Sequence, residues 1–538
     1  MITIRTLMDI KTLNTLDKAT QDTMPSFAKF SLSLLFILMV FLWTYTSHGT
    51  IPDNAFLIVG AVFGAYMAIN IGANDVANNV GPAVGARALT LTGAVIVAAI
   101  FEAAGAIIAG GDVVNTIKSG IIDPSLITDP HVFIWAMTAG LLAGAVWLNF
   151  ATSIGAPVST THAIVGGVMG AGIAGVGFSI VNWSSVGSIV ASWIISPLFG
   201  GIIAAGFLFF IKTKIIFCED KIAAANKFVP ILIAVMTWAF STYLILKGLR
   251  QVVHIGFISA SILSLIFAVI VYFVLKPIIF SKSLNLKNDR ASVNSLFTIP
   301  LIFGAALLSF AHGANDVSNA IGPLAAINDA VLTLAEGTSP HGSVGVPFWI
   351  MAVGASGIVI GLILYGPRLI RTVGSEITEL DQVRAFSIAM ATAITVIVAS
   401  QLGLPVSSTH IAIGGVFGVG FLREIMDSSE KKYIQDAREK FRKHKKKLEN
   451  MQIELKKFEL IKDKSKSDYI KIVDLFKKID EVEAIVEQER KDFKEAKGVK
   501  YVKRDAVKKI IAAWVITVPA SALLAAGIFY MIKGIVIV

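Results

Sequence analysis

Long apolar runs with few charges recur along the whole chain and constrain its fold more than any other feature. Leu91–Ala109, Ile189–Ile211 and Ile510–Tyr530 are three of them. Each is close to the ~20 residues that a helix needs to cross a bilayer. Hydrophobic residues make up 55% of the sequence, and the mean hydropathy is +0.73. A transmembrane β-barrel would instead alternate apolar and polar positions in segments of about ten residues. The sequence therefore predicts an all-α polytopic membrane protein.

Charged residues are concentrated in one segment. Residues 423–509 hold 27 Lys and Arg against 19 Asp and Glu, whereas the rest of the chain holds 20 and 18. This composition predicts a soluble basic hairpin over residues 423–507, with helices at Arg423–Lys462 and Tyr469–Lys497. The expected antiparallel coiled-coil seam pairs Ile453, Phe458 and Ile461 with Ile472, Phe476, Ile479 and Ile485.

The sequence of the basic hairpin is compatible with several partners. A solvated arm is the plainest interpretation, and binding to anionic lipid or to a regulatory protein is the alternative. Nucleic acid is not expected as a partner, because no aromatic or groove-reading motif accompanies the lysines.

Three sequence blocks occur twice in the same order. GANDVANNVGP (72–82) returns as GANDVSNAIGP (313–323), 241 residues later, and APVSTTH (156–162) returns as LPVSSTH (404–410), 248 residues later. IVASWIISP (189–197) returns as IIAAWVITVP (510–519), at an offset of about 320 because the basic hairpin interrupts the second copy. Such internal similarity indicates a duplicated structural unit.

The repeats divide the chain. We expect an N-terminal tail and extra helix (1–53), a first repeat (54–211), connecting helices (212–294), and a second repeat (295–422 and 508–538) around the hairpin (423–507). There are 13 apolar segments if those around PVSTTH and PVSSTH each cross the membrane. The basic loops, the N-terminus and the hairpin then share one side, which the positive-inside rule assigns to the cytoplasm of a plasma (inner) membrane. Seven passes separate the starts of the two copies, so their topology is expected to be inverted.

The first repeated block places carboxylates and carboxamides in apolar surroundings. Gly72 and the Gly81–Pro82 pair flank these polar residues and predict a helix break in each copy. Broken helices in inverted repeats are typical of transporter binding sites. Hard oxygen ligands suit a small cation, and an intramembrane carboxylate is a functional candidate by default. The predicted cation ligands are Asp75, Asp316, Asn78 and Asn319, with Asn74 and Asn315 beside them.

The second repeated block places hydroxyl groups at expected helix starts. Pro157 and Pro405 suit the first turn, where the missing N–H is not needed. Free N–H groups and the helix dipole then form an anion site without Lys or Arg. The predicted anion ligands are Ser159, Thr160, Thr161, Ser407, Ser408 and Thr409.

The charge balance of these blocks predicts coupled transport. Phosphate carries about −1.5 to −2 at neutral pH, and two aspartates add further negative charge. Two helix N-termini contribute a positive charge of only about +1, and none of the blocks contains Lys or Arg. An anion would be repelled unless cations entered with it. We therefore expect Asp75 and Asp316 to hold Na⁺ or H⁺ as the coupling ion.

The blocks resemble the paired signature of the PiT inorganic phosphate transporter family (solute carrier family 20). FEAAGAIIAGGDVVNTIKSGIID (101–123) is similar to the stretch that follows the first block in that family, and the resemblance covers about residues 55–425 and 508–535. It implies Na⁺- or H⁺-coupled phosphate uptake by two inverted repeats. It also implies cation binding at the aspartates and neighbouring asparagines, and phosphate binding at the hydroxyl runs. We assign Asn74 and Asn315 to the phosphate site as well. The basic hairpin and the extra N-terminal helix depart from the family pattern.

Four further residues are candidates. Glu102 has no counterpart in the second copy; the resemblance favours a cation-linked role, and a structural role is the alternative. His162 and His410 follow the hydroxyl runs, where they could donate to phosphate, carry a proton, or simply pack. His312 is a weaker candidate, because the first copy has Ile71 there.

Rival functions explain fewer of these features. Paired membrane aspartates occur in proteases, but that reading leaves the hydroxyl runs unexplained, and no G-x-S-x-G elbow surrounds Ser159. We therefore expect neither an enzyme nor a cofactor. Sulfate, a metal–phosphate complex and a phosphate-sensing role remain alternatives, as does assembly into a homo-oligomer. Carboxamide oxygens beside each aspartate favour Na⁺ over H⁺.

Overall fold

The computed structural model describes residues 25–537 apart from residues 50, 53, 128, 155–157, 249–254, 337–344, 377–379, 427, 461–464 and 499–503. The described residues are helical, with one isolated β-bridge between Ile122 and Val181. The chain divides into two compact units, residues 1–419 with 504–538 and residues 420–503. We call them the membrane unit and the arm.

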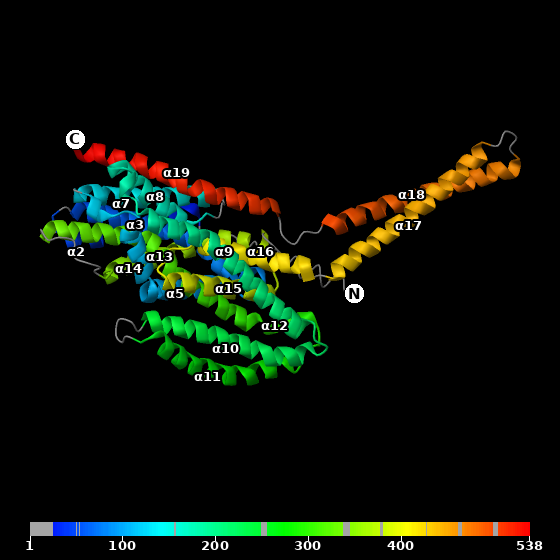
Figure 1. Cartoon of the computed structure of the whole chain (residues 1–538), viewed down its shortest axis with the longest axis horizontal. Coiled ribbons are helices and arrows are strands. Elements are labelled where there is room, and N and C mark those ends of the chain that lie inside the picture. The colour runs from blue at the N-terminus through cyan, green and yellow to red at the C-terminus, as the bar shows by residue number, and fades with distance from the viewer. Residues whose placement is uncertain are drawn as a thin grey trace. The chain divides into compact units, whose positions relative to one another are not determined.

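The first half of the membrane unit is built from helices α2 to α9 (Figure 1). The helices are α2 (Ser26–His48), α3 (Asn54–Asn74), α4 (Val76–Gly85), α5 (Leu91–Ala109), α6 (Gly111–Asn115), α7 (Pro130–Ser153), α8 (Thr160–Val176) and α9 (Trp183–Ile211). Short turns η1 (Thr116–Gly120), η2 (Pro124–Leu126), η3 (Phe178–Ile180) and η4 (Lys212–Ile216) connect some of them.

The second half of the membrane unit contains the remaining helices. They are α10 (Lys221–Gly248), α11 (Phe257–Ser283), α12 (Arg290–Leu296), α13 (Thr298–Glu336), α14 (Phe348–Glu376), α15 (Gln382–Gln401), α16 (Ser408–Met426) and α19 (Arg504–Ile537). Figure 1 shows α10 and α11 side by side at one edge of this unit.

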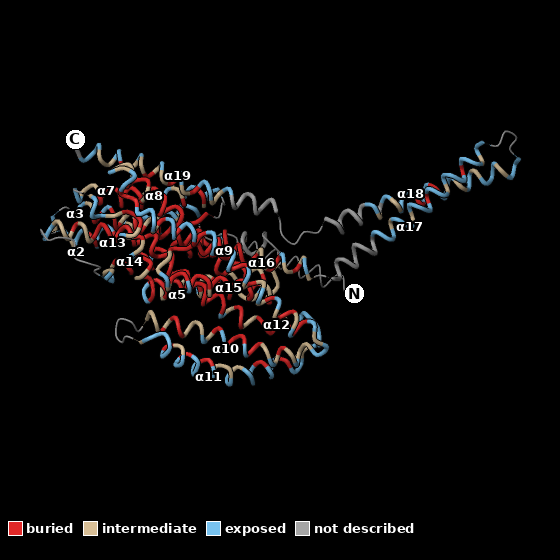
Figure 2. The backbone as a smooth tube through the Cα atoms, in the orientation of Figure 1, coloured by how far each residue is buried: buried red, intermediate tan, exposed pale blue. Residues whose placement is uncertain are grey.

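Eleven helices among the described residues are long and apolar enough to cross a membrane. The prediction of a multi-pass all-α membrane protein is confirmed. The two helices that begin with the hydroxyl runs, α8 and α16, are not among the eleven, and the count of 13 depends on their crossing the membrane. Many residues of α11 are exposed (Figure 2). The exposed residues of α2 and α11 include many large apolar ones, as expected for helices that face lipid.

Glycines bring the central helices into close contact. A Cβ atom on Gly72 of α3 would collide with the Ile358 carbonyl of α14, and one on Gly313 of α13 would collide with the Glu102 carbonyl of α5. Backbones can approach this closely only at residues without a side chain. These two motif glycines therefore serve helix packing.

The expected helix break occurs in only one copy. In the first copy α3 ends at Asn74 and α4 begins at Val76, so Asp75 lies at the interruption. In the second copy α13 is continuous from Thr298 to Glu336, and the predicted break is wrong. Close packing at Gly313 supports the helix through this region, and Pro323 removes only one backbone donor.

The arm contains two helices, α17 (Ser428–Glu459) and α18 (Lys466–Gly498), which pack against each other. Its buried seam is formed by Leu448, Leu455, Ile479 and Val482, with Met451, Ile472, Leu475 and Val486 packed around them.

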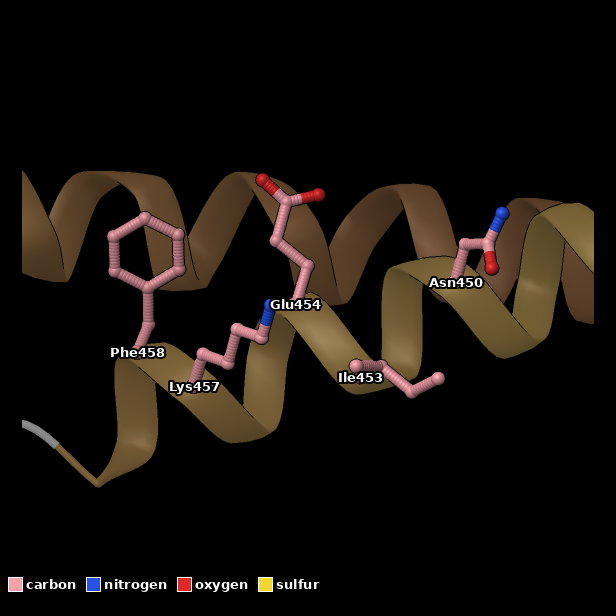
Figure 3. Close-up of a pocket in the computed structure, with 5 residues that line it drawn as sticks. All are labelled: Asn450, Ile453, Glu454, Lys457 and Phe458. Carbon is pink, nitrogen blue, oxygen red and sulfur yellow. The ribbon is translucent and has the colours of Figure 1, made fainter.

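The seam predicted from the sequence is largely wrong. Ile472 and Ile479 belong to it, but Ile453, Phe476 and Ile485 are 55%, 47% and 45% exposed. Figure 3 shows Ile453 on the side of α17 away from the second helix. Phe458 is only half-buried, and Ile461 lies outside the described residues. Leu448, Met451 and Leu455 follow the i, i+3, i+7 spacing of a helical seam. The face of α17 that packs against α18 therefore carries leucines and a methionine rather than the predicted Ile453 and Phe458.

Candidate functional site

Two aspartates and a histidine form the centre of the candidate site. Asp75 lies between α3 and α4, and His312 and Asp316 lie one turn apart on α13. One ligand atom from each residue lies within 4.8 Å of the others, and all three residues are buried. The duplicated aspartates, 241 positions apart, thus meet at one place, and the group has the size and chemistry of a cation site.

The second hydroxyl run contacts both aspartates. The Thr409 hydroxyl donates a hydrogen bond to Asp75 Oδ1 (3.0 Å) and accepts one from Asn78 Nδ2 (2.8 Å). Ser408 Oγ donates to Asp316 Oδ2 at 3.3 Å. The start of α16 is therefore joined to the carboxylates of both copies.

The first hydroxyl run contacts the opposite copy. Asn319 Nδ2 of α13 donates to Thr160 Oγ1 and Thr161 Oγ1, each at 3.1 Å. Thr161 Oγ1 also donates to the Val406 carbonyl at 3.0 Å, in the loop before α16. The two hydroxyl runs and the two polar blocks therefore form one buried polar cluster.

The two serines that precede these helices act as caps. Ser159 Oγ accepts from the His162 amide (3.1 Å), and Ser407 Oγ accepts from the His410 amide (3.3 Å). The remaining N–H groups of each first turn have no partner within the helix, which is what an anion site requires. Pro405 does not occupy the first turn as predicted, because it comes two residues before the Ser407 cap, and Pro157 lies outside the described residues.

Asn74 and Asn315 tie each polar block to the helix before the hydroxyl run. Asn74 Nδ2 donates to Thr152 Oγ1 (2.8 Å), and Asn315 Nδ2 donates to Ser400 Oγ (2.9 Å). Asn315 also accepts from the Val406 amide (3.3 Å). Thr152 and Ser400 occupy matching positions, so both copies use the same contact.

Several buried oxygens have no hydrogen-bond partner among the described residues. They belong to one carboxylate and three carboxamides, and each is a hard oxygen of the kind that binds small cations. A buried acceptor without a donor is costly unless a ligand or water satisfies it. The atoms are Asp316 Oδ1, Asn74 Oδ1, Asn79 Oδ1 and Asn319 Oδ1.

Glu102 lies behind His312 and does not contact the aspartates directly. Its Oε2 lies 2.7 Å from His312 Nδ1, and its Oε1 accepts from Asn79 Nδ2 at 2.7 Å. His312 Nε2 lies 2.9 Å from Asp316 Oδ2, close enough for an ion pair but without hydrogen-bond geometry. Glu102 is therefore linked to Asp316 through His312.

Sequence reasoning underrated His312 and did not single out Asn79. The spacing of four residues between His312 and Asp316, which places both on one helix face, could have raised the rank of the histidine. Asn79 stands four residues after Asp75 in the same way. Nothing in the sequence, however, indicated that Asn79 would contact Glu102.

His162 and His410 pack against aromatic rings. Their ring centroids are 4.5 Å apart, and the outer faces meet Trp193 (3.8 Å) and Trp514 (3.6 Å). Trp193 Nε1 also donates to the Pro405 carbonyl at 3.1 Å. Of the roles predicted for these histidines, packing is the one that these ring contacts support.

Known proteins that are similar to this chain are phosphate transporters and permeases. The model of the phosphate transporter family matches residues 71–525. A candidate phosphate permease of Helicobacter pylori strain J99 is 49% identical over 526 residues, covering 97% of this chain and 98% of the relative. A candidate phosphate permease of Haemophilus influenzae is 41% identical over 377 residues, covering 68% of this chain and 88% of the relative.

One solved structure is similar over most of its length. It is a sodium-dependent phosphate transporter with 29% sequence identity and a TM-score of 0.71, and the match covers 89% of this chain and 99% of that chain.

Proposed function

This chain belongs to the phosphate transporter family, and we propose that it is a symporter that imports inorganic phosphate together with Na⁺. The family makes it a phosphate transporter rather than an enzyme. Sodium coupling is supported by the similarity to a sodium-dependent phosphate transporter. It is also supported by the oxygen-rich site around the aspartates.

One observation carries the proposal: hydroxyl groups of the second run contact the buried aspartates of both copies. Thr409 contacts Asp75 and Ser408 contacts Asp316, in a cluster whose sequence blocks contain no Lys or Arg. Phosphate beside two carboxylates would be repelled in a low dielectric. Cations bound between them would remove this repulsion, so phosphate and cation binding would depend on each other.

The proposed roles follow the contacts. Phosphate would be held by the hydroxyl groups of Thr160, Thr161, Ser408 and Thr409, with first-turn N–H groups of α8 and α16. Na⁺ would be held by carboxylate and carboxamide oxygens, while Ser159 and Ser407 keep the helix starts in place. The proposed cation ligands are Asp75, Asp316, Asn78 and Asn319, with the free oxygens of Asn74 and Asn79; Glu102 acts through His312.

Alternating access of two inverted repeats is the proposed mechanism. The matching contacts Asn74–Thr152 and Asn315–Ser400 support it, because equivalent residues play equivalent parts in each copy. Repeats arranged in this way can exchange conformations and so expose a shared midplane site to each side in turn.

H⁺ coupling is the alternative, and it is favoured by one feature. The chain Asp316–His312–Glu102 could carry a proton instead of holding a metal cation. A metal–phosphate complex or another oxyanion such as sulfate would fit the same hydroxyl groups.

We further propose that the protein lies in the plasma (inner) membrane, with the N-terminus and the arm in the cytoplasm. Residues 438–447 of α17 contain seven Lys and Arg, all outside the seam, and one acidic residue. A surface of this charge suits anionic lipid headgroups. A regulatory protein with an acidic surface is the competing partner.

The proposal is tested by phosphate binding to purified protein, measured by calorimetry. We expect the phosphate affinity to rise with Na⁺ concentration, to be unaffected by K⁺, and to change little when sulfate is added. Binding that is independent of Na⁺ and of pH would contradict coupling, and equal competition by sulfate would change the substrate class.

A further inference from the structure

A short segment between α5 and α7 touches the candidate site, although none of the roles above uses it. It consists of α6 (Gly111–Asn115) and the π-helical turn η1 (Thr116–Gly120), and we call it the strap. Val113, Val114 and Ile117 of the strap are fully buried. One face of the strap therefore packs into the interior, while Asn115 and Ser119 are exposed.

The strap packs on the part of α13 that carries the second polar block. A Cβ atom on Gly322 would lie 2.6 Å from Ile117 Cγ2, and one on Gly110, next to the strap, would lie 2.8 Å from Val317 Cγ1. Val317 follows Asp316 directly, and Gly322 comes three residues after Asn319. The strap thus lies against the stretch of α13 that bears two proposed cation ligands.

The strap also holds the loop that leads into the second hydroxyl run. Thr116 Oγ1 donates a hydrogen bond of 2.6 Å to the carbonyl of Gly403, whose φ of 67° belongs to the left-handed region. Three residues on, Val406 N bonds Asn315 Oδ1. The loop is therefore held between the strap and α13, immediately before Ser407.

Two ion pairs fasten the strap to other helices. Lys118 pairs with Asp329 of α13, and Asp112 pairs with Lys247 of α10. The side chains of Asp329 and Asp112 are 27% and 32% exposed, and those of Lys118 and Lys247 are 13% and 8% exposed, so water reaches the carboxylate side of each pair and weakens it in part. Asp329 lies in the segment 326–345, which we predict to face outside because it carries no Lys or Arg.

We propose that the strap is the gate of the phosphate site on the extracytoplasmic side. Its bond to Gly403 closes the space between α13 and the loop before α16, and its release lets phosphate reach the hydroxyl groups of Ser408 and Thr409. A single hydroxyl–carbonyl bond and partly exposed ion pairs are weak enough to break and re-form in each cycle. This inference rests on the proposed function of cation-coupled phosphate transport.

A reversible crosslink tests the gate directly. A Cβ atom on Gly403 would lie 3.5 Å from Thr116 Oγ1, so the Thr116→Cys/Gly403→Cys pair can form a disulfide in the closed state. The chain's single cysteine is first removed by Cys218→Ser. Phosphate uptake into proteoliposomes is measured before oxidation, after oxidation and after reduction. The matched control is Ile122→Cys/Val181→Cys, which crosslinks the β-bridge beside the strap without bridging the two repeats.

The gate predicts loss of at least about tenfold in uptake on oxidation, full recovery on reduction, and no change in the control pair. It also predicts faster crosslinking with Na⁺ and phosphate present, because the loaded site closes. Uptake that survives complete crosslinking would overturn the gate. So would a disulfide that never forms although both cysteines react singly with maleimide. The Gly403→Cys single variant is measured as well, because a side chain at the left-handed φ of Gly403 is strained. Uptake by the wild type verifies transport itself, so failure of the gate and failure of the proposed function give different results.

Discussion

The hydroxyl of Thr409 donates a hydrogen bond of 3.0 Å to Asp75, although the two residues stand 334 positions apart. Asp75 belongs to the first polar block and Thr409 to the second hydroxyl run. The bond therefore joins the proposed cation ligand of one copy to the proposed phosphate ligand of the other. Ligands that share a hydrogen bond in this way are well placed to couple the binding of two ions.

Replacing Thr409 with Val should weaken transport without unfolding the protein. The change keeps the shape of the side chain but removes the donor to Asp75 and the acceptor for Asn78. We expect the uptake efficiency for phosphate to fall about 10- to 100-fold, the size of one or two lost bonds to charged groups. The control is Thr138→Val, because Thr138 is equally buried but bonds only the Ile134 carbonyl of its own helix. Equal effects of the two changes would show that Thr409 is structural.

Asp316→Asn should abolish coupling while keeping the side-chain volume. The variant replaces a carboxylate with a neutral carboxamide, so the site loses the charge that holds a cation beside phosphate. We expect uptake under a Na⁺ gradient to fall to background, as measured with radiolabelled phosphate. Asp123→Asn, at a half-buried carboxylate outside the site, should retain normal uptake. Normal Na⁺-dependent uptake by Asp316→Asn would remove this residue from the cation site.

His312→Leu should destabilise the fold as well as transport. His312 lies between Glu102 and Asp316, and its loss leaves two buried carboxylates without the ionic partner that they share. Removing one member of a buried ionic group typically costs about 3–5 kcal/mol, which thermal unfolding in detergent will show as a lower Tm.

The double change His312→Leu/Glu102→Leu separates stability from transport. It removes the stranded Glu102 carboxylate, so Tm should recover in part while uptake remains absent. Recovery of uptake in the double variant would mean that neither residue acts in transport.

Gly72→Ala should prevent assembly of the membrane unit. The added methyl group would collide with the Ile358 carbonyl, where α3 and α14 pack backbone to backbone. We expect little monodisperse protein by fluorescence-detected gel filtration. Gly187→Ala is the matched control, because a Cβ atom there meets nothing within 4 Å. A well-folded Gly72→Ala variant would contradict the observed helix contact.

The arm should be protected from trypsin by vesicles that contain anionic lipid. Arg442, Lys443, Lys446 and Lys447 are exposed on α17, and contact with anionic headgroups would shield them and would weaken at high salt. Changing all four to Gln should remove both the protection and its salt dependence. Protection that depends instead on an added acidic protein would identify that protein as the partner, and equal cleavage in all vesicles would refute lipid binding.

Much of the fold and of the site composition could be predicted from the sequence. Apolar runs of helical length identify membrane helices, because only helices and closed barrels can satisfy all their backbone hydrogen bonds inside a bilayer. Asp75 and Asp316 could be identified as functional candidates, because a carboxylate inside a membrane segment is costly and usually has a function. The arm hairpin was recognisable by its charge, whereas Ser159 and Ser407, which we predicted as anion ligands, cap their helices.

Other features depend on contacts that no local pattern encodes. The continuity of α13 depends on close packing at Gly313, whereas the same motif permits an interruption at Asp75. The exchange of partners between copies, such as Asn319 with Thr160, requires knowing how the repeats meet. The link from Glu102 to His312 joins residues 210 positions apart. The arm seam was misplaced because Ile453 and Phe476 were chosen by hydrophobicity without fixing the helical phase.

The most direct test of coupled transport is radiolabelled phosphate uptake into proteoliposomes under an inward Na⁺ gradient or an inward H⁺ gradient, each with wild-type protein and with Asp75→Asn. We expect the wild type to accumulate phosphate under the Na⁺ gradient alone and the variant to accumulate none. Accumulation driven only by the H⁺ gradient, or Na⁺-driven accumulation by Asp75→Asn at the wild-type rate, would contradict the assignment of Na⁺ to this site.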